Sequence, residues 1–257
     1  MTLQQQYIAF RTILIKEVLR FSRIWLQTVL PPMITTALYF VIFGKLIGSQ
    51  IGDINGFSYM EFIVPGLIMM AIISHSYANV VSSFYGAKFQ RHIEEMLVSP
   101  TPHYVIVLGF VGGGVARGLA VGVAVTLVSL LFTRVPVHSL WIAVSVAVLT
   151  AFVFSLAGLI NAVFAKSFDD ISIIPTFVLT PLTYLGGIFY TIQMLPDFWQ
   201  HVSFGNPILY MINGFRYGLL GIADIQLFTC YLIIIGFIAL LFGMSLWLLK
   251  KGVGIRS

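Results

Sequence analysis

Long apolar runs alternate with short polar segments along almost the whole chain. Six of these runs reach the roughly 20 residues that a helix needs to cross the hydrocarbon core of a membrane. They cover residues 25–47, 59–84, 104–132, 138–165, 171–191 and 227–249. The pattern predicts an all-α polytopic membrane protein with six transmembrane helices, folded as a single domain over residues 1–257.

A different periodicity precedes the first run. Apolar residues recur there at every third or fourth position, and basic residues stand off that stripe. The apolar positions are Leu3, Tyr7, Phe10, Leu14, Val18, Phe21 and Trp25, and the basic ones are Arg11, Lys16, Arg20 and Arg23. The spacing predicts an amphipathic helix over residues 1–24 that lies in the membrane interface, with an ordinary basic flanking stretch as the alternative.

Residues 192–226 are too polar to cross a membrane and too apolar to dissolve as a separate domain. Their backbone would be satisfied in short helices that dip into the membrane and return under cover of the rest of the protein. Pro196 and Pro207 suit the first turns of two such helices. We therefore predict an external re-entrant helical hairpin, with an external soluble cap as the alternative.

The basic residues that flank the runs set the orientation. Ten of them fall on one side of the predicted membrane and three on the other. The ten are Arg11, Lys16, Arg20, Arg23, Lys88, Arg91, Lys166, Lys250, Lys251 and Arg256, and the three are Lys45, Arg134 and Arg216. Because cytoplasmic segments carry the excess of Lys and Arg, both termini are predicted to be cytoplasmic.

Composition excludes a soluble protein. Hydrophobic residues make up 59% of the chain and charged residues 9%, whereas soluble domains have about 25% charged residues. The formal net charge of +5 comes from residues beside apolar runs, so the expected partner is membrane lipid and not nucleic acid. A single cysteine, Cys230, leaves no intrachain disulfide and no cysteine-based metal cluster.

The sequence carries no nucleotide-binding or catalytic pattern. A P-loop needs G-x-x-x-x-G-K-[ST] to cradle phosphates, and the only Gly-Lys pair, Gly44-Lys45, is followed by Leu46. The five histidines lack the spacing of metal ligands, and no buried Ser or Thr has a base at helical spacing. We expect a chain that is not an enzyme and binds no cofactor or metal, so that any ATP is hydrolysed on a separate chain.

The segment 88–100 is a candidate docking helix. Phe89, Ile93, Met96 and Leu97 share one face at helical spacing, and Pro100 ends the segment. An amphipathic helix outside the membrane can lay such a face in a groove of a partner. The alternative is a simple connection between two spans.

Arg117 and Glu61 are charged residues within predicted spans. Arg117 lies near the middle of the third run, where it should face protein or water, and Glu61 begins the second run. Both are candidates for a transport path. The alternatives are a structural role for Arg117, paired with a carbonyl or with Glu61, and a position in the membrane interface for Glu61. Around Arg117, four-residue spacings allow close helix contact at Gly109, Gly113, Gly114, Gly118 and Gly122.

Two motifs resemble those of ABC-2 type transporter permeases. One is Glu94-x-x-Leu97-x-Ser99-Pro100, which follows the second run. The other extends from Leu179 to Arg216 and reads Leu179-x2-Leu182-x2-Leu185-Gly186-x-Ile188, then Leu195-Pro196, then Pro207-Ile208-x-Tyr210, then Arg216. The layout of six spans after an interfacial helix is similar to that family along the whole chain.

This resemblance implies a half-transporter of the bacterial inner membrane. Two permease subunits, a homodimer, would form the pathway, and two copies of a separate ATP-binding subunit would dock below. Segment 88–100 would be the coupling helix, with Phe89, Ile93, Glu94, Leu97, Ser99 and Pro100 as its contact residues. The family signature would rest on Gly186, Pro196, Pro207, Tyr210 and Arg216, and residues 194–216 would form the outward hairpin.

The function expected from these observations is that of the permease subunit of an ATP-driven exporter. It would move a lipid, glycan or hydrophobic compound across the inner membrane by alternating access. The alternative is a secondary transporter, against which stand the few intramembrane carboxylates and the absence of a visible two-half repeat. An intramembrane enzyme is disfavoured because no acid and base are paired.

Overall fold

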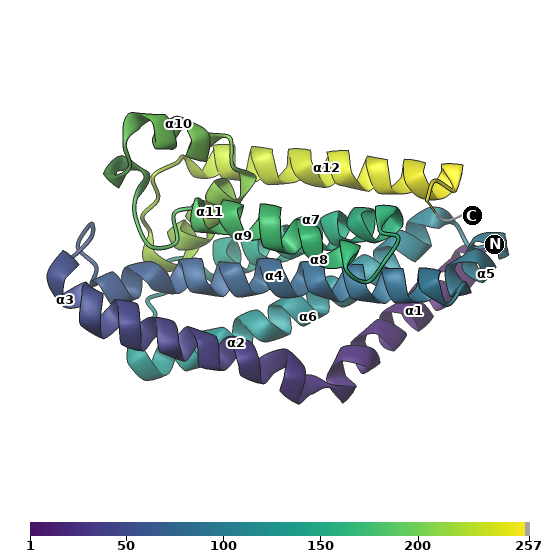
Figure 1. Cartoon of the computed structure of the whole chain (residues 1–257), viewed down its shortest axis with the longest axis horizontal. Coiled ribbons are helices and arrows are strands. Elements are labelled where there is room, and N and C mark those ends of the chain that lie inside the picture. The colour runs from purple at the N-terminus through teal and green to yellow at the C-terminus, as the bar shows by residue number, and fades with distance from the viewer. Residues whose placement is uncertain (255–257) are drawn as a thin grey trace.

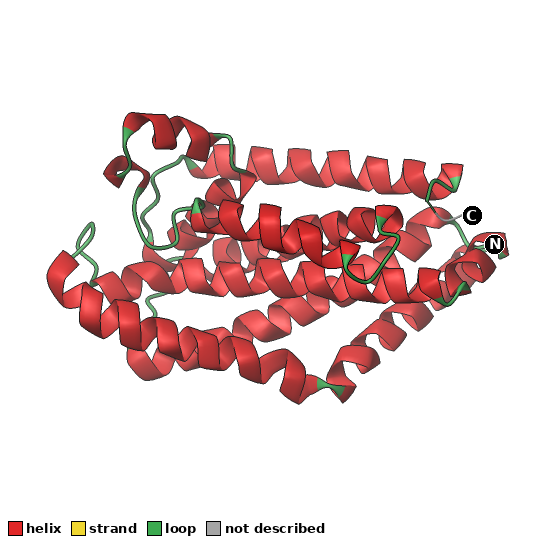
Figure 2. Ribbon diagram, in the orientation of Figure 1, coloured by secondary structure: helices red, strands yellow, loops and turns green. Residues whose placement is uncertain are grey.

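The computed structural model describes residues 1–254, except for the side chains of residues 45–47 and 49. This part of the chain is helical and forms no strand (Figure 2). The elements are α1 Leu3–Arg23, α2 Trp25–Tyr39, the π-helical η1 Phe40–Ile47, α3 Gly48–Ile51, α4 Tyr59–Phe89, α5 His92–Val98, α6 His103–Phe132, α7 Leu140–Phe164, α8 Asp170–Ile174, the π-helical η2 Pro175–Leu179, α9 Thr180–Tyr184, the 3₁₀ turn η3 Ile192–Met194, α10 Asp197–Phe204, α11 Pro207–Leu220 and α12 Leu227–Lys251.

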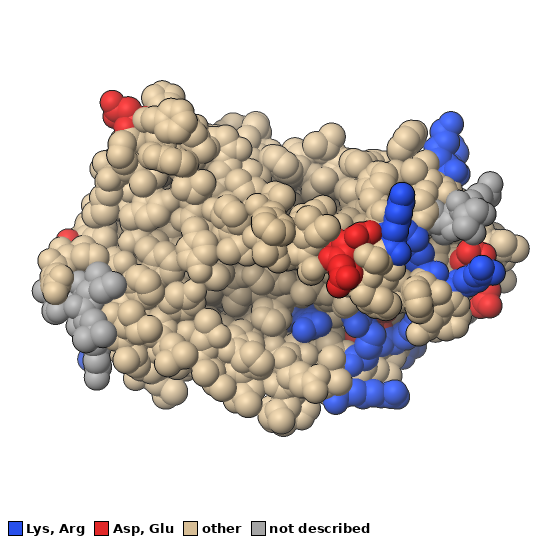
Figure 3. Space-filling view, in the orientation of Figure 1, with Lys and Arg blue, Asp and Glu red and all other residues tan. Residues whose placement is uncertain are grey.

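Five helices are long and apolar enough to cross a membrane: Trp25–Gly44, Tyr59–Phe89, His103–Phe132, Leu140–Phe164 and Leu227–Lys251. They run side by side, and both chain termini lie at the same end of the bundle (Figure 1). Lys and Arg side chains gather at this terminal end, as the positive-inside count requires of a cytoplasmic face (Figure 3). Five of the six predicted runs are thus confirmed as long apolar helices.

The predicted run 171–191 has a different form. Helices α8, η2 and α9 follow one another without a break from Asp170 to Tyr184, with 5 residues each. At 1.5 Å per residue this stretch is about 22 Å long, which is short of the roughly 30 Å of a hydrocarbon core. The chain then turns at Gly187, whose φ of 75° favours glycine. A sixth crossing here stays a prediction.

Helix α4 lies at the centre of the bundle and packs against α6 and α7. The contacts depend on glycine, because an added Cβ on Gly122 would lie 2.7 Å from Ile72, and one on Gly158 would lie 2.6 Å from the carbonyl oxygen of Tyr77. Added Cβ atoms at the other predicted glycines of α6 would also meet neighbouring helices: Gly109, Gly113, Gly114 and Gly118. The predicted role of these glycines in close helix packing is confirmed.

Helix α1 forms as predicted, but its apolar stripe divides between two environments. Its start is fixed by a capping box between Thr2 and Gln5. One face, with Ile13 and Leu14, packs on the glycines of α6. Phe10, Val18 and Phe21 are half-buried, and the large apolar side chains that stay exposed are Leu3, Tyr7, Ile8, Ile15 and Leu19. The helix is therefore docked on the bundle along one face and open along the other.

The segment after α9 folds into helices that begin where the prolines predict. Pro196 precedes α10, and Pro207 is the first residue of α11, capped by the side chain of Asn206. Helix α10 projects from the end of the bundle opposite the termini (Figure 1). Helix α11 is buried along most of its length, against α7, α12 and α4. The two helices are present, while their pairing as a re-entrant hairpin stays a prediction.

The α4–α7 contact generates a paired test. Gly158→Ala would place a Cβ against the backbone of α4, whereas Gly236→Ala on α12 would place one in open space. We expect Gly158→Ala to lower the free energy of unfolding by about 1–3 kcal/mol, as overpacking does, and Gly236→Ala to be neutral or slightly stabilising. Thermal unfolding in detergent, followed by size-exclusion chromatography, measures both. Equal melting temperatures would contradict the assignment of this contact.

Candidate functional site

The family-signature residues gather at the end opposite the termini, around Arg216. The Arg216 side chain is 1% exposed, and its guanidinium donates a hydrogen bond to the carbonyl oxygen of Gly187. The same guanidinium lies over the ring of Phe62, 4.1 Å from the ring centroid. A buried cation is stabilised by a carbonyl dipole and by the face of an aromatic ring. Arg216 therefore fastens α11 to the turn after α9 and to the start of α4.

The other signature residues shape the same region. An added Cβ on Gly186 would lie 2.9 Å from Ile208, so glycine lets the turn approach α11. Asn206 donates a hydrogen bond of 2.6 Å to the carbonyl oxygen of Leu182, and the hydroxyl of Tyr210 donates one of 2.7 Å to the carbonyl oxygen of Phe204. With Pro196 and Pro207 at helix starts, these residues build a scaffold.

The predicted coupling segment consists of two pieces. Phe89 ends α4, and the chain then breaks at Arg91, which has a φ of 63°. A non-glycine residue in this left-handed region costs about 1–3 kcal/mol and persists only where the surroundings hold it. Helix α5 begins after the break at His92 and ends at Val98. The break changes which side chains of the segment face outward.

The sequence predicts that Ile93 belongs to the apolar face that the segment presents to a partner, together with Phe89 and Leu97. This prediction is wrong for Ile93. This side chain is 1% exposed and belongs to the chain's own core, and Leu97 is half-buried against the same core. The apolar side chains left open are Phe89, 66% exposed, and Val98, 87% exposed. A charge placed at Ile93 would therefore disrupt this chain, whatever its partner.

Polar contacts hold α5 at the terminal end of the bundle. The ammonium group of Lys88 donates hydrogen bonds of 2.7 Å to the carbonyl oxygens of Val163 and Ala165, which join the end of α4 to the end of α7. The hydroxyl of Ser99 donates one of 2.6 Å to the carbonyl oxygen of Met96 and so closes α5. The outer face of α5 presents Glu94, Glu95 and Val98, and Pro100 is also exposed. This face is a firmly held surface with both acidic and apolar groups.

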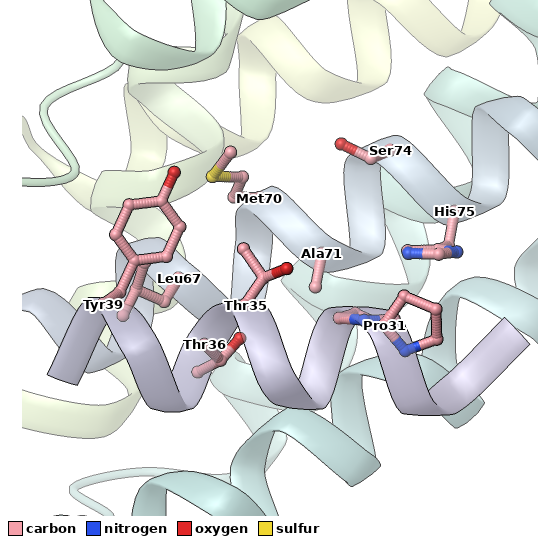
Figure 4. Close-up of a pocket in the computed structure, with 10 residues that line it drawn as sticks. Pro31, Thr35, Thr36, Tyr39, Leu67, Met70, Ala71, Ser74 and His75 are labelled. Carbon is pink, nitrogen blue, oxygen red and sulfur yellow. The ribbon is translucent and has the colours of Figure 1, made fainter. Parts of the chain in front are cut away.

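A pocket of about 240 Å³ lies between α2 and α4 (Figure 4). Its walls carry hydroxyl groups beside aliphatic and aromatic side chains, and the lining residues are Pro31, Pro32, Thr35, Thr36, Tyr39, Leu67, Met70, Ala71, Ser74 and His75. Figure 4 shows that Tyr39 and His75 lie at opposite ends of the pocket, His75 beside Pro31. The pocket thus follows the length of α4, with an ionisable side chain at one end.

A second pocket, of about 90 Å³, adjoins the first. Both are lined by Met70 and Ser74, and the second is bounded on its far side by Pro175, Leu179, Thr180 and Thr183. Toward the end opposite the termini, the hydroxyls of Tyr39 and Tyr184 are 3.2 Å apart, and the rings of Phe43 and Phe189 stack with centroids 4.8 Å apart. We call these joined pockets the α4 groove: an amphipathic channel along α4, walled by α2 and η2–α9 and narrowed by aromatic residues.

The structure separates the two charged candidates for a transport path. Glu61 accepts hydrogen bonds from the backbone nitrogen of Ser58, at 3.0 Å, and from its hydroxyl, at 2.8 Å. It is thus the capping partner at the start of α4. The residue next to Arg117, Gly118, packs on Ser76, 15 residues further along α4 and so about 22 Å away. The alternative of a Glu61–Arg117 pair is wrong.

Arg117 lies instead within electrostatic range of His75 of α4 and of Arg20 of α1. Its side chain is half-buried, and its Nε atom has no hydrogen-bond partner among the described residues. Placing an arginine near the middle of a span costs about 2.5–3.5 kcal/mol on insertion scales. Arg117 is therefore a cation in the bundle that this part of the chain leaves uncompensated.

A buried polar cluster beside Arg117 was missed by the sequence analysis. Glu17 of α1 is 0% exposed; it accepts a hydrogen bond of 2.6 Å from the hydroxyl of Ser83 and forms an ion pair of 3.3 Å with Arg20. Arg20 donates hydrogen bonds to the side-chain and main-chain oxygens of Asn79, at 2.8 and 2.9 Å. The cluster fastens α1 to α4. The one sequence signal was a lone acid in a strongly basic helix.

The arrangement suits binding and passage of a molecule better than bond chemistry. The α4 groove offers hydroxyls and apolar walls, and no group of three or more His, Cys, Asp or Glu able to hold a metal ion occurs in the part of the chain that is described. The groove is amphipathic, and small-molecule sites are typically apolar pockets with a few placed polar groups.

Comparison with known proteins gives a consistent picture. The family model of the ABC-2 type transporter matches residues 8–220. The chain is 60% identical over 252 residues to the inner membrane transport permease YadH of Escherichia coli (strain K12), with 98% of each chain covered. It is 28% identical over 182 residues to nodulation protein J of Sinorhizobium fredii (strain NBRC 101917 / NGR234), with 70% of this chain and 69% of that protein covered. It is 24% identical over 207 residues to nodulation protein J of Rhizobium meliloti (strain 1021), with 80% of this chain and 79% of that protein covered.

The Glu17 cluster generates a test with a neighbouring control. Ser83→Ala removes the hydroxyl that donates to the buried carboxylate of Glu17, whereas Ser82→Ala removes only a hydrogen bond to the carbonyl oxygen of Asn79. Leaving a buried acceptor short of a donor costs about 1–3 kcal/mol. We expect Ser83→Ala to lower thermal stability clearly more than Ser82→Ala does. If Ser82→Ala were the more damaging change, α1 would not depend on this cluster.

Proposed function

Because this chain belongs to the ABC-2 type transporter family, we propose that it is the membrane-spanning subunit of an ATP-binding cassette exporter. The chain is a multi-pass transport permease of the inner membrane. In the proposal it moves a lipid, glycan or hydrophobic compound outward by alternating access. ATP is bound and hydrolysed by a separate subunit, in two copies, beneath a homodimer of this chain.

The observation that carries this proposal is the α4 groove. One chain supplies its floor, α4, and two walls, α2 and η2–α9, and its lining combines hydroxyls with apolar groups. Exposed apolar side chains continue beyond both walls: Ile34, Leu38, Val41, Phe177 and Val178. A second copy placed over this face would close the groove into a pathway, which supports the homodimer.

The walls also supply the freedom to open and close that alternating access needs. Helix α2 contains Pro31 and Pro32 and passes into the π-helical η1, while the opposite wall contains Pro175 at the start of η2. Proline removes a backbone hydrogen bond, and π-helical segments interrupt the regular ladder, so that both features let a helix bend. The central α4 packs on α6 and α7 and is the fixed element between the two walls.

The motor would dock at the terminal end, on α5. Its outer face presents Glu94, Glu95 and Val98, and the exposed Phe89 ring packs edge-on against Phe168 with centroids 5.3 Å apart. Exposed apolar groups beside carboxylates favour a groove with apolar walls and a basic rim in the partner. In this proposal the terminal end is cytoplasmic, the chain crosses the membrane six times, and the α10–α11 hairpin re-enters the outer leaflet.

Val98→Asp tests the motor interface without disturbing the fold, because the side chain is 87% exposed. A carboxylate would lose its hydration when the partner covers it, so we expect docking to weaken by more than about tenfold. The measurement is co-purification of the ATPase subunit with the tagged permease, together with ATP hydrolysis. Val137→Asp, at an exposed apolar position of the loop between α6 and α7, is the matched control and should keep the wild-type complex. A Val98→Asp complex of wild-type stoichiometry, or a complex with a single permease copy, would contradict the proposal.

Reporter fusions test the orientation. Reporters placed after Gly52, Val135 and Gln193 should all report the periplasmic side, and a reporter at the C terminus should report the cytoplasm, since the excess of basic side chains lies at the terminal end. Gln193 tests the sixth crossing, because it follows the short α8–α9 stretch. A cytoplasmic signal at any of the three internal positions would break the proposed topology.

A further inference from the structure

At the terminal end of the α4 groove, the basic side chains outnumber the acidic side chains that could neutralise them. Arg117 lies within electrostatic range of His75 and Arg20, and its neighbours on α6, Gly113 and Gly118, pack on Glu17 and Ser76. The acid of this region, Glu17, already accepts hydrogen bonds from the hydroxyl of Ser83 and the guanidinium of Arg20. Arg20 is thereby paired, whereas Arg117 forms no ion pair within residues 1–254. A charge in a low-dielectric bundle is normally matched by an opposite one. Here the partner must come from outside this part of the chain.

Buried side-chain atoms without a hydrogen-bond partner in this place include the donor Nε of Arg117 and the ring atom Nδ1 of His75, and Nδ2 of Asn79 in the adjoining cluster is another. His75 lies at the Pro31 end of the pocket between α2 and α4, and the rest of that pocket is mainly apolar (Figure 4). Unsatisfied buried donors are rare in folded proteins and call for an explanation. Nε belongs to the guanidinium of Arg117, which forms no ion pair within the described residues. An anionic oxygen bound here would accept hydrogen bonds from these groups.

A basic approach leads to the same place from the membrane surface. A hollow of about 590 Å³ on the outer side of α1 is lined by the cations Lys16, Arg20 and Arg23 among apolar side chains that include Ile15 and Leu19. Arg20 thus belongs both to this hollow and to the cluster beside Arg117. Figure 3 shows Lys and Arg atoms set in from the charged end, among residues that are neither basic nor acidic. Cations in an apolar recess attract an anionic headgroup whose tail stays in the lipid.

We propose that the terminal end of the α4 groove binds the anionic headgroup of an amphiphile, with Arg117 and His75 as its ligands. The apolar pocket between α2 and α4 takes the adjoining part of its chain, and the hollow on α1 collects it from the cytoplasmic leaflet. The inference rests on the proposed transport function, whose substrate class it narrows. It assigns to Arg117 the role of selecting charge.

The test uses the full-length permease in detergent without its ATPase, and native mass spectrometry to count bound molecules. The probes are dodecyl phosphate, dodecanol of the same chain length, and inorganic phosphate. We expect dodecyl phosphate to bind at least about tenfold more tightly than either of the others, since a charge-assisted contact and an apolar chain act together. Equal binding of dodecanol, or equal binding of inorganic phosphate, would overturn the proposal.

Variants locate the site. Arg117→Gln should reduce the affinity for dodecyl phosphate about tenfold and leave dodecanol unchanged, whereas Arg117→Lys, which keeps the charge, should retain most of the preference. The matched control, Arg134→Gln, removes an exposed cation at the opposite end of α6 and should bind like the wild type. If Arg117→Gln folds and keeps the full preference, the proposal is wrong. If it does not fold, loss of the preference for dodecyl phosphate in Arg117→Lys would overturn the proposal just as directly.

The outcome is separable from that of the motor assignment. Binding is measured without ATPase or ATP, so it is expected even if Val98→Asp shows that the ATPase docks elsewhere. Conversely, a permease that loses its ATPase in Val98→Asp but binds dodecanol as well as dodecyl phosphate would remain an exporter subunit. Only the proposal that the substrate is an anionic amphiphile would then be contradicted.

Discussion

The close packing of α4 against α6 and α7 is the constraint on which the rest of the structure depends. Apolar burial drives helices together weakly in lipid, so association needs surfaces that let backbones approach. Gly118 and Gly122 of α6 and Gly158 of α7 provide these surfaces. With one side of α4 held in this way, its opposite side, at Met70 and Ser74, is free to line the groove.

Buried cations divide into those that hold the fold and the one that does not. Arg216 satisfies its charge on the carbonyl oxygen of Gly187 and the ring of Phe62, and Arg20 satisfies its charge on Glu17 and Asn79. Each joins helices far apart in sequence, at opposite ends of the bundle. Nε of Arg216 also lacks a hydrogen-bond partner, but Arg117 differs in making neither a hydrogen bond nor an ion pair with another residue of the described chain. An unpaired charge is costly inside a membrane. The contrast therefore supports ligand binding as the role of Arg117 and the joining of helices as the role of Arg216 and Arg20.

Features set by local sequence were predictable, and features set by the rotation of helices were not. Apolar runs, the glycines of α6 and the starts at Pro196 and Pro207 follow from composition and spacing alone. The Ile93 side chain faces the core because the helix breaks at Arg91. No sequence motif predicts that an arginine adopts a left-handed backbone conformation. The role of Glu61 could have been predicted. Ser58 lies three residues before it, and this spacing is the signature of a capping box, in which the Glu61 carboxylate caps the start of α4.

The contacts also connect the proposed motor surface to the groove through one helix. Lys88, at the end of α4, is bonded to the end of α7 next to α5, and Asn79, further along α4, holds Arg20 of α1. One turn beyond Asn79 lies His75, at the end of the pocket. A displacement of α5 therefore reaches His75 through about three and a half turns of continuous helix. In the proposed cycle the proline-bearing walls would bend about α4, whose own proline, Pro65, lies before the part of the helix that lines the pocket, and the width of the groove would change at its terminal end.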